Sequence, residues 1–498
     1  MSSHFLSKFL NPKSVSIYGA NNSVTGLGTI QLMNIIMSGY KGKIFPIHLK
    51  LDSVLGYKAY KSIEKVPEIP ELVIIVLPPK VVPQIFRECG EKGVKHIVLI
   101  SGGFRELTGD KENNYTDQIK RIADLYSIRF IGPNCLGFFN AWIYPKDSET
   151  ALNTSIWEKL DRGTFSIASQ SGTLSSHIFF DPENLDLGLS KSISVGNEAD
   201  VDVVDCLEYF KDDEHTETIG LYIEELKRGR KFLELANQVS VRKPIITIYA
   251  GGSKASNRAI KSHTGSIGGN EKIYDGVFKE TGIIKTQLVE EFLDIARVLS
   301  KGILPKGNRV GIVTNSGGPG IMIANHAEKE GLLVPEFSDE LKSQLKDLVP
   351  KTGSFRNPVD YTFNMNLKNY YLSIPKTLMK SGEIDVLVIY GTFDFQQVIK
   401  SYLAHERIRK YIEPPSSSGK DTPPMEKLFI APILAASKKY SIPVLYINPQ
   451  PYSSEWSKKM RKEGALLFQL WDRPIRCISK ICKYADYRMK RIKRKKSK

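Results

Sequence analysis

Histidine 263 is the residue of this chain best suited to carry a covalent intermediate. It stands in the run Ser262-His263-Thr264-Gly265-Ser266-Ile267-Gly268-Gly269, inside a stretch from Gly251 to Asn270 that is rich in glycine, serine and asparagine. Imidazole is a nucleophile at neutral pH and a good leaving group once phosphorylated. The small residues around it predict a mobile loop, and a long loop inside a compact domain is usually functional. His263 is therefore a candidate carrier of a phosphoryl group.

Two other runs have the composition of anion-binding turns. Ser169-Gln170-Ser171-Gly172-Thr173-Leu174 follows an apolar run and opens a helical pattern, and so does Asn315-Ser316-Gly317-Gly318-Pro319-Gly320. Free N–H groups and the positive end of the helix dipole bind phosphate at such turns. Glu224 and Glu225 follow a further apolar run. An acid there can accept a hydrogen bond from one imidazole nitrogen and aim the other nitrogen at phosphorus.

A third glycine-rich turn opens the chain's first α/β segment. Residues Gly19 to Gly28 follow the apolar run Ser14–Tyr18, and glycines there let the backbone approach a phosphate at a helix N-terminus. An NAD site would place Asp or Glu after the next strand, which instead ends in Ile47-His48-Leu49-Lys50. These residues suit a phosphate better, which favours CoA, with NADP as the alternative.

The elements that position these turns follow one repeated pattern of apolar strand, glycine-rich turn and amphipathic helix. Continuous apolar runs separated by helix-length segments indicate parallel sheets with helices on both faces, an α/β fold. The predicted strands are Ser14–Tyr18, Lys43–Ile47, Leu72–Leu77, His96–Ile100, Arg129–Ile131, Thr164–Ala168, Ser192–Val195, Ile219–Ile223, Pro244–Tyr249, Val310–Thr314, Val386–Tyr390 and Val444–Ile447.

Breaks in this pattern divide the chain into three domains and a tail. Tyr144–Leu160 is interpreted as a linker, Lys301–Asn308 as a second break, and Glu413–Pro424 as a surface insertion. The predicted domains are residues 1–145, 146–302 and 303–475, followed by a basic tail over 476–498. The second and third domains are predicted to be distant duplicates, because each opens with a strand that leads into a Ser/Gly turn and a helix.

Composition excludes several classes of protein. Of 498 residues, 41% are hydrophobic and 25% charged, as in soluble globular proteins, and no apolar run is long enough to span a bilayer. Met1–Lys13 lacks an apolar signal core, and the five scattered cysteines indicate reduced thiols in a cytoplasm rather than disulfides or zinc. Half of the net charge of +16 comes from residues 488–498, which hold eight Lys and Arg and no acid. We expect a disordered tail and no specific binding of nucleic acid.

Taken in order, these motifs resemble those of nucleoside-diphosphate-forming acyl-CoA synthetases, specifically the alpha subunits of the ADP-forming acetate–CoA ligase type in the succinyl-CoA synthetase superfamily. The resemblance spans Phe9 to Trp471. It includes Asn11-Pro12-Lys13, the Gly-Pro-Asn-Cys-Leu-Gly run of Gly132–Gly137, the Ser169–Leu174 turn, and Asn357-Pro358-Val359-Asp360. It implies a Rossmann-like CoA-binding domain followed by two flavodoxin-like domains.

The resemblance also implies roles for individual residues. His263 would be phosphorylated and Glu224 would orient its ring, with Glu225 as the fallback. No metal site is expected on this chain, and Cys135 is interpreted as a packed thiol, because no adjacent histidine would activate it. The implied CoA contacts are Gly19, Ala20, Lys50, Pro78, Phe104 and Asn134, and the implied phosphate contacts are Ser169, Ser171, Gly172, Thr173, Asn315, Ser316, Gly317 and Gly318.

The implied reaction converts acyl-CoA, phosphate and ADP into carboxylic acid, CoA and ATP by way of an acyl phosphate and a phosphohistidine. The sequence shows no ATP-grasp pattern and no GxxxxGK[ST]. A separate ATP-grasp beta subunit holding Mg²⁺ with ADP or ATP is therefore expected, in a heterotetramer. Tyr390-Gly391-Thr392-Phe393 departs from the Thr-Pro-Gln-like turn common in the family, so the acyl group stays open, as does ADP against GDP. Two alternatives remain, a non-catalytic CoA-binding regulator and a nicotinamide-dependent oxidoreductase.

Overall fold

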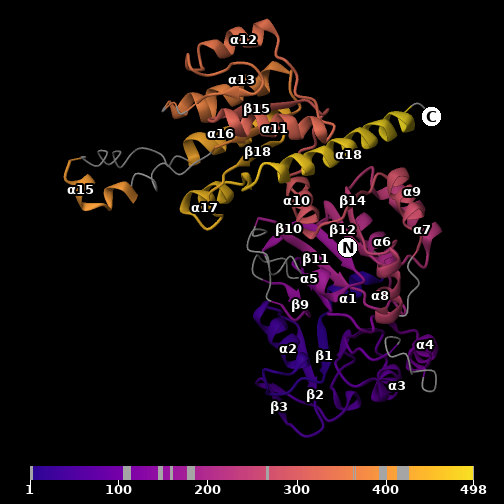
Figure 1. Ribbon diagram of the computed structural model, residues 1–498. Coiled ribbons are helices and arrows are strands. Elements are labelled where there is room, and N and C mark those ends of the chain that lie inside the picture. Colours follow the sequence, from indigo (N-terminus) through magenta and orange to yellow (C-terminus); the bar gives the residue numbers. More distant parts are fainter. Residues whose placement is uncertain are drawn as a thin grey trace. The chain divides into compact units, whose positions relative to one another are not determined.

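The computed structural model describes residues 4–104, 114–143, 150–157, 161–176, 186–264, 269–362, 364, 366–391, 401–411 and 426–496. The chain divides into two compact units, Met1–Ala296 and Arg297–Lys498. Unit 1 contains two large sheets and unit 2 contains one, and helices cover the faces of each (Figure 1). Among the described residues, no helix combines the length and the apolar composition that a membrane span requires.

The first sheet of unit 1 has five parallel strands in the order β2-β1-β5-β6-β7. All five were predicted; β1, β2 and β7 have the predicted bounds, while β5 and β6 end one or two residues earlier. The strands are β1 Ser14–Tyr18, β2 Lys43–Ile47, β5 Leu72–Ile75, β6 His96–Leu99 and β7 Arg129–Ile131, with a hairpin of β3 Ser53–Val54 and β4 Tyr57–Lys58. The helices are α1 Leu6–Leu10, α2 Leu27–Met37, α3 Val82–Lys92 and α4 Tyr115–Tyr126.

The second sheet has seven strands in the order β14-β13-β12-β10-β11-β8-β9. Five are parallel, and β8 and β9 extend the sheet in antiparallel fashion. The strands are β8 Phe138–Asn140, β9 Leu152–Asn153, β10 Arg162–Ser169, β11 Leu189–Ser194, β12 Thr218–Ile223, β13 Ile245–Tyr249 and β14 Ile284–Thr286. The helices are α5 Gly172–Ser176, α6 Val203–Asp212, α7 Gly229–Val239, α8 Lys254–Thr264, α9 Glu271–Thr281 and α10 Val289–Leu299.

The predicted linker Tyr144–Leu160 is wrong for its described part. Residues 150–155 are buried and include β9. Ala151 exchanges hydrogen bonds with Ser38, the C-cap of α2: its N–H donates to the Ser38 carbonyl (2.9 Å), and its carbonyl accepts from the Ser38 hydroxyl (3.0 Å). The polar composition was misleading because these polar groups find partners inside the protein.

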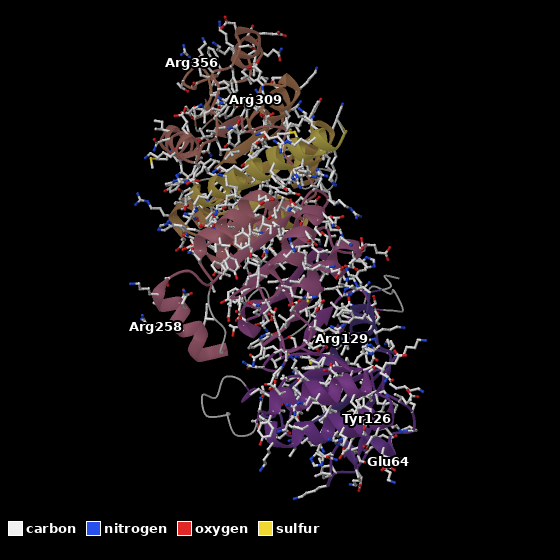
Figure 2. The ribbon with its side chains drawn as sticks, turned by 90° about the vertical axis from the view of Figure 1, so that its right-hand side faces the viewer. Glu64, Tyr126, Arg129, Arg258, Arg309 and Arg356 are labelled. Carbon is white, nitrogen blue, oxygen red and sulfur yellow. The ribbon has the colours of Figure 1, made fainter. Side chains whose placement is uncertain are left out.

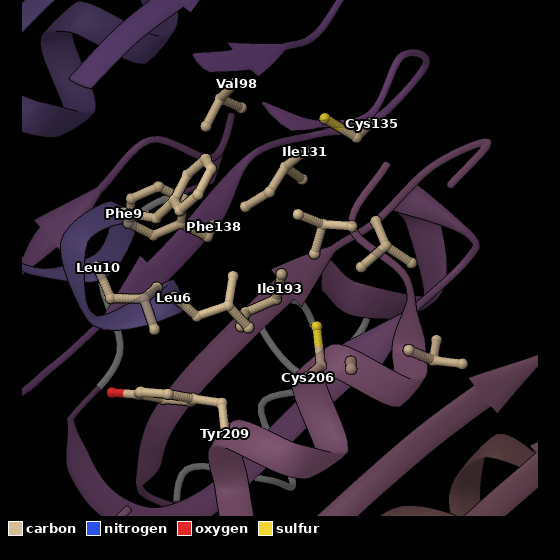
Figure 3. Packing of buried hydrophobic residues seen from close by; sticks show 14 of the residues in the cluster. Leu6, Phe9, Leu10, Val98, Ile131, Cys135, Phe138, Ile193, Cys206 and Tyr209 are labelled. Carbon is tan, nitrogen blue, oxygen red and sulfur yellow. The ribbon is translucent and has the colours of Figure 1, made fainter. Parts of the chain in front are cut away.

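The two sheets of unit 1 share one hydrophobic core. Side chains from the first sheet and its helices, such as Phe9 and Ile131, belong to the same buried cluster as Ile193 of β11 and Cys206 of α6 (Figure 3). A continuous core restricts relative motion, so turns from the two sheets can form one site with defined geometry. The boundary at 145/146, like that at 302/303, stays a prediction.

Unit 2 contains a five-stranded parallel sheet in the order β16-β15-β17-β18-β19. The predicted strands β15, β17 and β18 have the expected bounds, and Glu413–Pro424 lies outside the described residues. The strands are β15 Val310–Thr314, β16 Val359–Asp360, β17 Val386–Tyr390, β18 Val444–Ile447 and β19 Leu466–Phe468. The helices are α11 Gly317–Lys329, α12 Asp339–Lys346, α13 Ile374–Ser381, α15 Glu406–Arg409, α16 Ala431–Tyr440, α17 Glu455–Lys462 and α18 Asp472–Lys496.

The expectation of a disordered tail is wrong up to Lys496. The whole segment from Asp472 forms the 25-residue helix α18. Apolar residues recur every three or four positions, and Ile475, Ile478 and Ile481 are fully buried. This stripe packs along α11 and initiates a helix that the basic residues then continue. The number of charged residues in the tail gives no indication of this buried stripe.

All three sheets place their parallel strands in the same order. Numbered within each sheet by position in the chain, the strands follow the order 2-1-3-4-5. The chain therefore reverses direction across each sheet between the first and third strands. A crevice opens outside the carboxyl ends of strands at such a switch point, and ligands bind there. The three switch points lie after β1 and β5, after β10 and β12, and after β15 and β17.

Candidate active site

The first switch point is shaped by close backbone approach around Gly19. Its φ is +89°, and a Cβ atom at this position would lie 2.1 Å from the carbonyl oxygen of Val76, at the end of the neighbouring strand. A Cβ on Gly28, in the first turn of α2, would lie 2.6 Å from the main chain of Gly19. The glycines thus bring the β1 turn, the β5 turn and the start of α2 together, as a nucleotide diphosphate requires.

Replacing Gly19 by alanine is expected to lower the free energy of unfolding of unit 1 by about 2–4 kcal/mol, since strain at positive φ adds to a steric clash. Urea denaturation followed by circular dichroism measures the loss. Gly56→Ala is the matched control, because Gly56 has a φ of +83° with nothing within 4 Å of the new Cβ. Equal losses in the two variants would show that the approach to Val76 contributes nothing.

The other residues predicted to contact CoA differ in their solvent exposure. Lys50 and Pro78 are exposed at their turns, whereas Ala20 and Phe104 are wholly buried and shape the turns from beneath. His48 accepts hydrogen bonds at Nδ1 from the N–H groups of Lys50 (3.1 Å) and Leu51 (2.9 Å). His48 therefore orders the turn that presents Lys50.

Asn134 lies where the first sheet meets the second. Its N–H donates to the Ser101 carbonyl (2.9 Å), and its side-chain amide donates to Oδ1 of Asn197, which follows β11 (3.3 Å). Arg129, labelled in Figure 2, donates from Nε to both carboxylate oxygens of Asp200 (3.0 and 2.9 Å) along the same seam. These contacts hold the Gly132–Gly137 turn against the second sheet.

Cys135 is a packed thiol, as expected from the sequence. It is buried, its Sγ donates to the Leu99 carbonyl (3.3 Å), and burial raises its pKa to about 12. A thiol that stays protonated at neutral pH is a poor nucleophile. Cys135 therefore supports the turn and takes no part in the chemistry.

The Ser169–Thr173 turn occupies the second switch point. Ser169 Oγ accepts from the Ser171 N–H (3.1 Å) and donates to the Ser171 carbonyl (2.6 Å). Gly172 lies so close to Leu136 that a Cβ there would be 2.6 Å from its Cγ. The turn is thus in contact with the Gly132–Gly137 segment of the first sheet. Ser171 and Gly172 are half-buried and Thr173 is exposed, so the turn presents surface to a ligand.

Glu224 follows β12 on the other side of this switch point. Its N–H donates to Oε1 of Gln170, at the centre of the Ser169–Thr173 turn (2.5 Å). Its carboxylate lies beside the Tyr222 hydroxyl, and burial together with this carboxylate raises the pKa of Tyr222 above its usual range. The fold therefore places a half-buried acid directly beside the candidate phosphate turn, and the predicted role of Glu224 in orienting His263 stays a prediction.

The sequence motifs gave no role to two residues of this site, Gln170 and Glu198. Gln170 lies inside a recognised turn, but nothing in the pattern indicated its contacts. Glu198, which follows β11, is buried; burial raises its pKa to about 7 against the opposing effect of Lys227. An acid three residues after the predicted strand Ser192–Val195 was the signal that could have found it.

The Glu198 carboxyl is expected to make stability depend on pH. The pKa of Glu198 is 4.5 in the unfolded chain and about 7 in the folded protein. Between these two pH values the folded state therefore binds a proton that the unfolded state has released. Stability therefore falls as pH rises through this window and levels off above it. Glu198→Gln removes the effect: we expect it to exceed the wild type at pH 8 by roughly 1–3 kcal/mol and to match it at pH 5. Urea unfolding at the two pH values checks this, and a constant difference would contradict it.

The third switch point repeats the second. Thr314 Oγ1 accepts from the Ser316 N–H (3.0 Å) and donates to the Ser316 carbonyl (2.7 Å), and Asn315 donates to the carbonyl of Gly391 after β17 (2.9 Å). Ser316 is the N-cap of α11, which begins at Gly317. The turn has the same architecture as Ser169–Thr173, but Gly391 stands where Glu224 stands in unit 1.

His263 lies near the end of helix α8, so the predicted loop Gly251–Asn270 is wrong for Lys254–Thr264. Ser253 Oγ accepts from the Ser256 N–H (2.9 Å), an N-cap interaction that starts the helix. Figure 2 shows α8 with Arg258 labelled. The His263 side chain and residues 265–268 lie outside the described residues, so contact between His263 and Glu224 stays a prediction. No cluster of three or more metal-binding side chains occurs among the described residues.

Comparison with known proteins identifies the family. Residues 13–141 match the CoA binding domain family, and residues 162–299 match the succinyl-CoA ligase like flavodoxin domain. The alpha subunit of ADP-forming acetate–CoA ligase II from Pyrococcus furiosus is 38% identical over 77% of this chain and 81% of its own length. The alpha subunit of ligase I from that organism is 36% identical over 93% and 97%. This chain belongs to the ADP-forming acetate–CoA ligase family.

The ligase also matches solved structures over nearly its full length. A Ca. Korarchaeum cryptofilum dinucleotide forming acetyl-coenzyme A synthetase 1, in complex with phosphate and ADP, has a TM-score of 0.80 and 29% identity, covering 98% of both chains. The ADP-forming acetate–CoA ligase of Methanocaldococcus jannaschii is 39% identical, and the match covers 70% of this chain but 48% of that one. The ligase is thus an acyl-CoA synthetase of the NDP-forming, acid–thiol type, with CoA as a substrate.

Proposed function

We propose that this ligase interconverts acyl-CoA, phosphate and ADP with carboxylic acid, CoA and ATP through a phosphohistidine at His263. A phosphate oxygen attacks the thioester carbonyl, forming acyl phosphate as the C–S bond breaks and CoA leaves as the thiolate. An imidazole nitrogen of His263 then attacks phosphorus and the carboxylate leaves. The phosphoryl group finally passes to ADP. Glu224 accepts a hydrogen bond from the other ring nitrogen and stabilises the charged ring.

The observation that carries this proposal is the meeting of three turns at one edge of unit 1. The Gly132–Gly137 segment contacts the Ser169–Thr173 turn through Leu136 and Gly172, and that turn contacts Glu224 through Gln170. A thioester bound beside the Gly132–Gly137 segment would therefore lie next to phosphate held by Ser169, Ser171, Gly172 and Thr173. Positioning and charge neutralisation supply most of the catalysis in phosphoryl transfer.

In unit 2, Asn315, Ser316, Gly317 and Gly318 form a second phosphate turn on the same plan. It lacks an acid after the third strand, since Gly391 stands there, which supports binding of phosphate without a paired histidine.

The partner is an ATP-grasp beta subunit that binds ADP or ATP with Mg²⁺, in a heterotetramer. The relatives from Pyrococcus furiosus are named alpha subunits, and this chain matches only about half of the single-chain ligase of Methanocaldococcus jannaschii. Both facts support a second polypeptide that supplies the remainder. None of the five cysteines, all of which lie among the described residues, forms a disulfide, which supports a reducing compartment, the cytoplasm.

Intact-mass spectrometry tests the proposal. The purified chain is incubated with phosphate and, in turn, acetyl-CoA, 4-hydroxybutyryl-CoA and feruloyl-CoA, acyl groups that follow the names of its relatives. An acid-labile adduct of one phosphoryl group is expected with at least one of them. If no adduct forms either alone or with the beta subunit, while CoA still binds, the chain is a CoA-binding regulator instead.

A further inference from the structure

The side-chain amide of Gln170 joins the phosphate turn to the turn that carries the acid. Its Oε1 accepts from the N–H groups of Glu224 (2.5 Å) and Glu225 (3.1 Å), and its Nε2 donates to the Glu225 carbonyl (2.7 Å). One amide thus satisfies three main-chain groups of the adjacent turn. Because Oε1 faces two donors and Nε2 faces an acceptor, the orientation of the amide is determined.

Burial makes this junction rigid. Gln170 is 7% exposed, and its own N–H donates to the Tyr222 carbonyl at the end of β12 (3.3 Å). Its amide also bonds with Glu198, whose Oε1 accepts from the Val203 N–H (2.9 Å). A buried amide with all its groups paired has one preferred position, since any displacement leaves polar groups unsatisfied.

The corresponding turn in unit 2 shows which of these hydrogen bonds also form where no acid directly follows the third strand. Asn315 occupies the position of Gln170 and donates to the Gly391 carbonyl (2.9 Å), but its Oδ1, although buried, has no partner among the described residues. The shorter side chain links the turn to the end of the third strand, and the Gly391 N–H, which corresponds to that of Glu224, donates to the Ile447 carbonyl instead (2.9 Å). Where an acid follows the third strand, the side chain is one methylene longer and makes three bonds.

We propose that Gln170 is a positioning residue of phosphoryl transfer: it fixes the main chain of Glu224 relative to the Ser169–Thr173 turn. The inference rests on the proposed function and names a residue that acts through Glu224, not on the substrate. A displacement of about 1 Å in a reacting group can lower the rate roughly 100-fold. A rigid link between the acid and the Ser169–Thr173 turn would therefore maintain the rate of phosphoryl transfer.

The test measures the rate of His263 phosphorylation in a single turnover, with saturating acyl-CoA, radiolabelled phosphate and the full chain. Gln170→Asn copies the unit 2 arrangement and preserves a tie to the strand, so it is expected to fold. We expect its rate to fall roughly 10–100-fold while CoA binds within about twofold of the wild type. Gln238→Ala, an exposed glutamine on α7, is the matched control and is expected to phosphorylate at the wild-type rate.

A double-mutant cycle separates positioning from general structural damage. If Gln170 acts through Glu224, Gln170→Asn should lower the rate less than about threefold in a Glu224→Gln background. An equal fold-loss in both backgrounds, or a wild-type rate in the single variant, overturns the inference. A wild-type chain that never becomes phosphorylated overturns the proposed function instead, and the inference with it.

Discussion

A His263→Asn variant is expected to carry no phosphoryl adduct after incubation with acyl-CoA and phosphate, and to lose ATP formation by about a thousandfold or more. Asparagine has no nucleophilic nitrogen, so the acyl phosphate has no acceptor. The first step does not use the imidazole. Phosphate-dependent exchange of labelled CoA into acyl-CoA should therefore continue in the variant, while the adduct disappears from its mass spectrum.

His405→Asn is the control, because this exposed histidine of unit 2 lies outside every turn described above. It should become phosphorylated as the wild type does. An adduct that persists in His263→Asn would mean that another side chain receives the phosphoryl group. Loss of CoA exchange together with the adduct would mean that the substitution disturbs the first switch point rather than the transfer step.

Replacing Glu224 by glutamine is expected to slow phosphorylation of His263 by roughly 100- to 1,000-fold. The amide keeps the size of the side chain and its bonds through the main chain to Gln170, but it loses the negative charge that stabilises a charged phosphoimidazole. Single-turnover labelling with radioactive phosphate measures the rate. Binding of CoA should be unaffected, because Glu224 follows β12 of the second sheet, whereas the first switch point lies after β1 and β5 of the first sheet.

Glu225→Gln is the matched variant one residue along the chain. Both main-chain N–H groups bind the same Oε1 of Gln170, so the two positions differ mainly in where their carboxylates lie. We expect Glu225→Gln to lower the rate less than about threefold. A larger loss in Glu225→Gln than in Glu224→Gln would transfer the role to Glu225, the fallback that the sequence left open.

The local sequence predicted strands well where each was a single continuous apolar run. Buried parallel strands are continuous apolar runs, so β1, β2, β7, β15, β17 and β18 were found with their bounds. The short strands β8, β9, β14, β16 and β19 were missed, because two or three residues carry no readable period. Their pairing depends on neighbours that lie far away in the sequence.

Two wrong predictions, the loop around His263 and the disordered tail, have the same cause. Both rest on the overall composition of a segment and ignore the order of its residues. The stretch around His263 is rich in small polar residues, yet no glycine interrupts Ser253–Thr264 and a serine caps its start, so it forms α8. The predicted tail 476–498 is rich in lysine and arginine, yet it contains Ile478 and Ile481, which are buried like the preceding Ile475 and stabilise the first turns of α18. Helix propagation costs little once a first turn is stabilised by packing.

The sequence by itself determined the residue types available to this ligase: an imidazole, two turns of the composition proposed for phosphate, a glycine turn proposed for CoA and an acid after a strand. Residue type and immediate neighbours decide these properties. Only the tertiary structure decided which of them meet. The strand order 2-1-3-4-5 brings the Ser169 turn to Glu224, some 50 residues away, and the core shared by two sheets brings Leu136 to Gly172. Strand order and side-chain reach are set by packing between distant segments, which no local pattern records, and so the role of Gln170 became visible only in the fold.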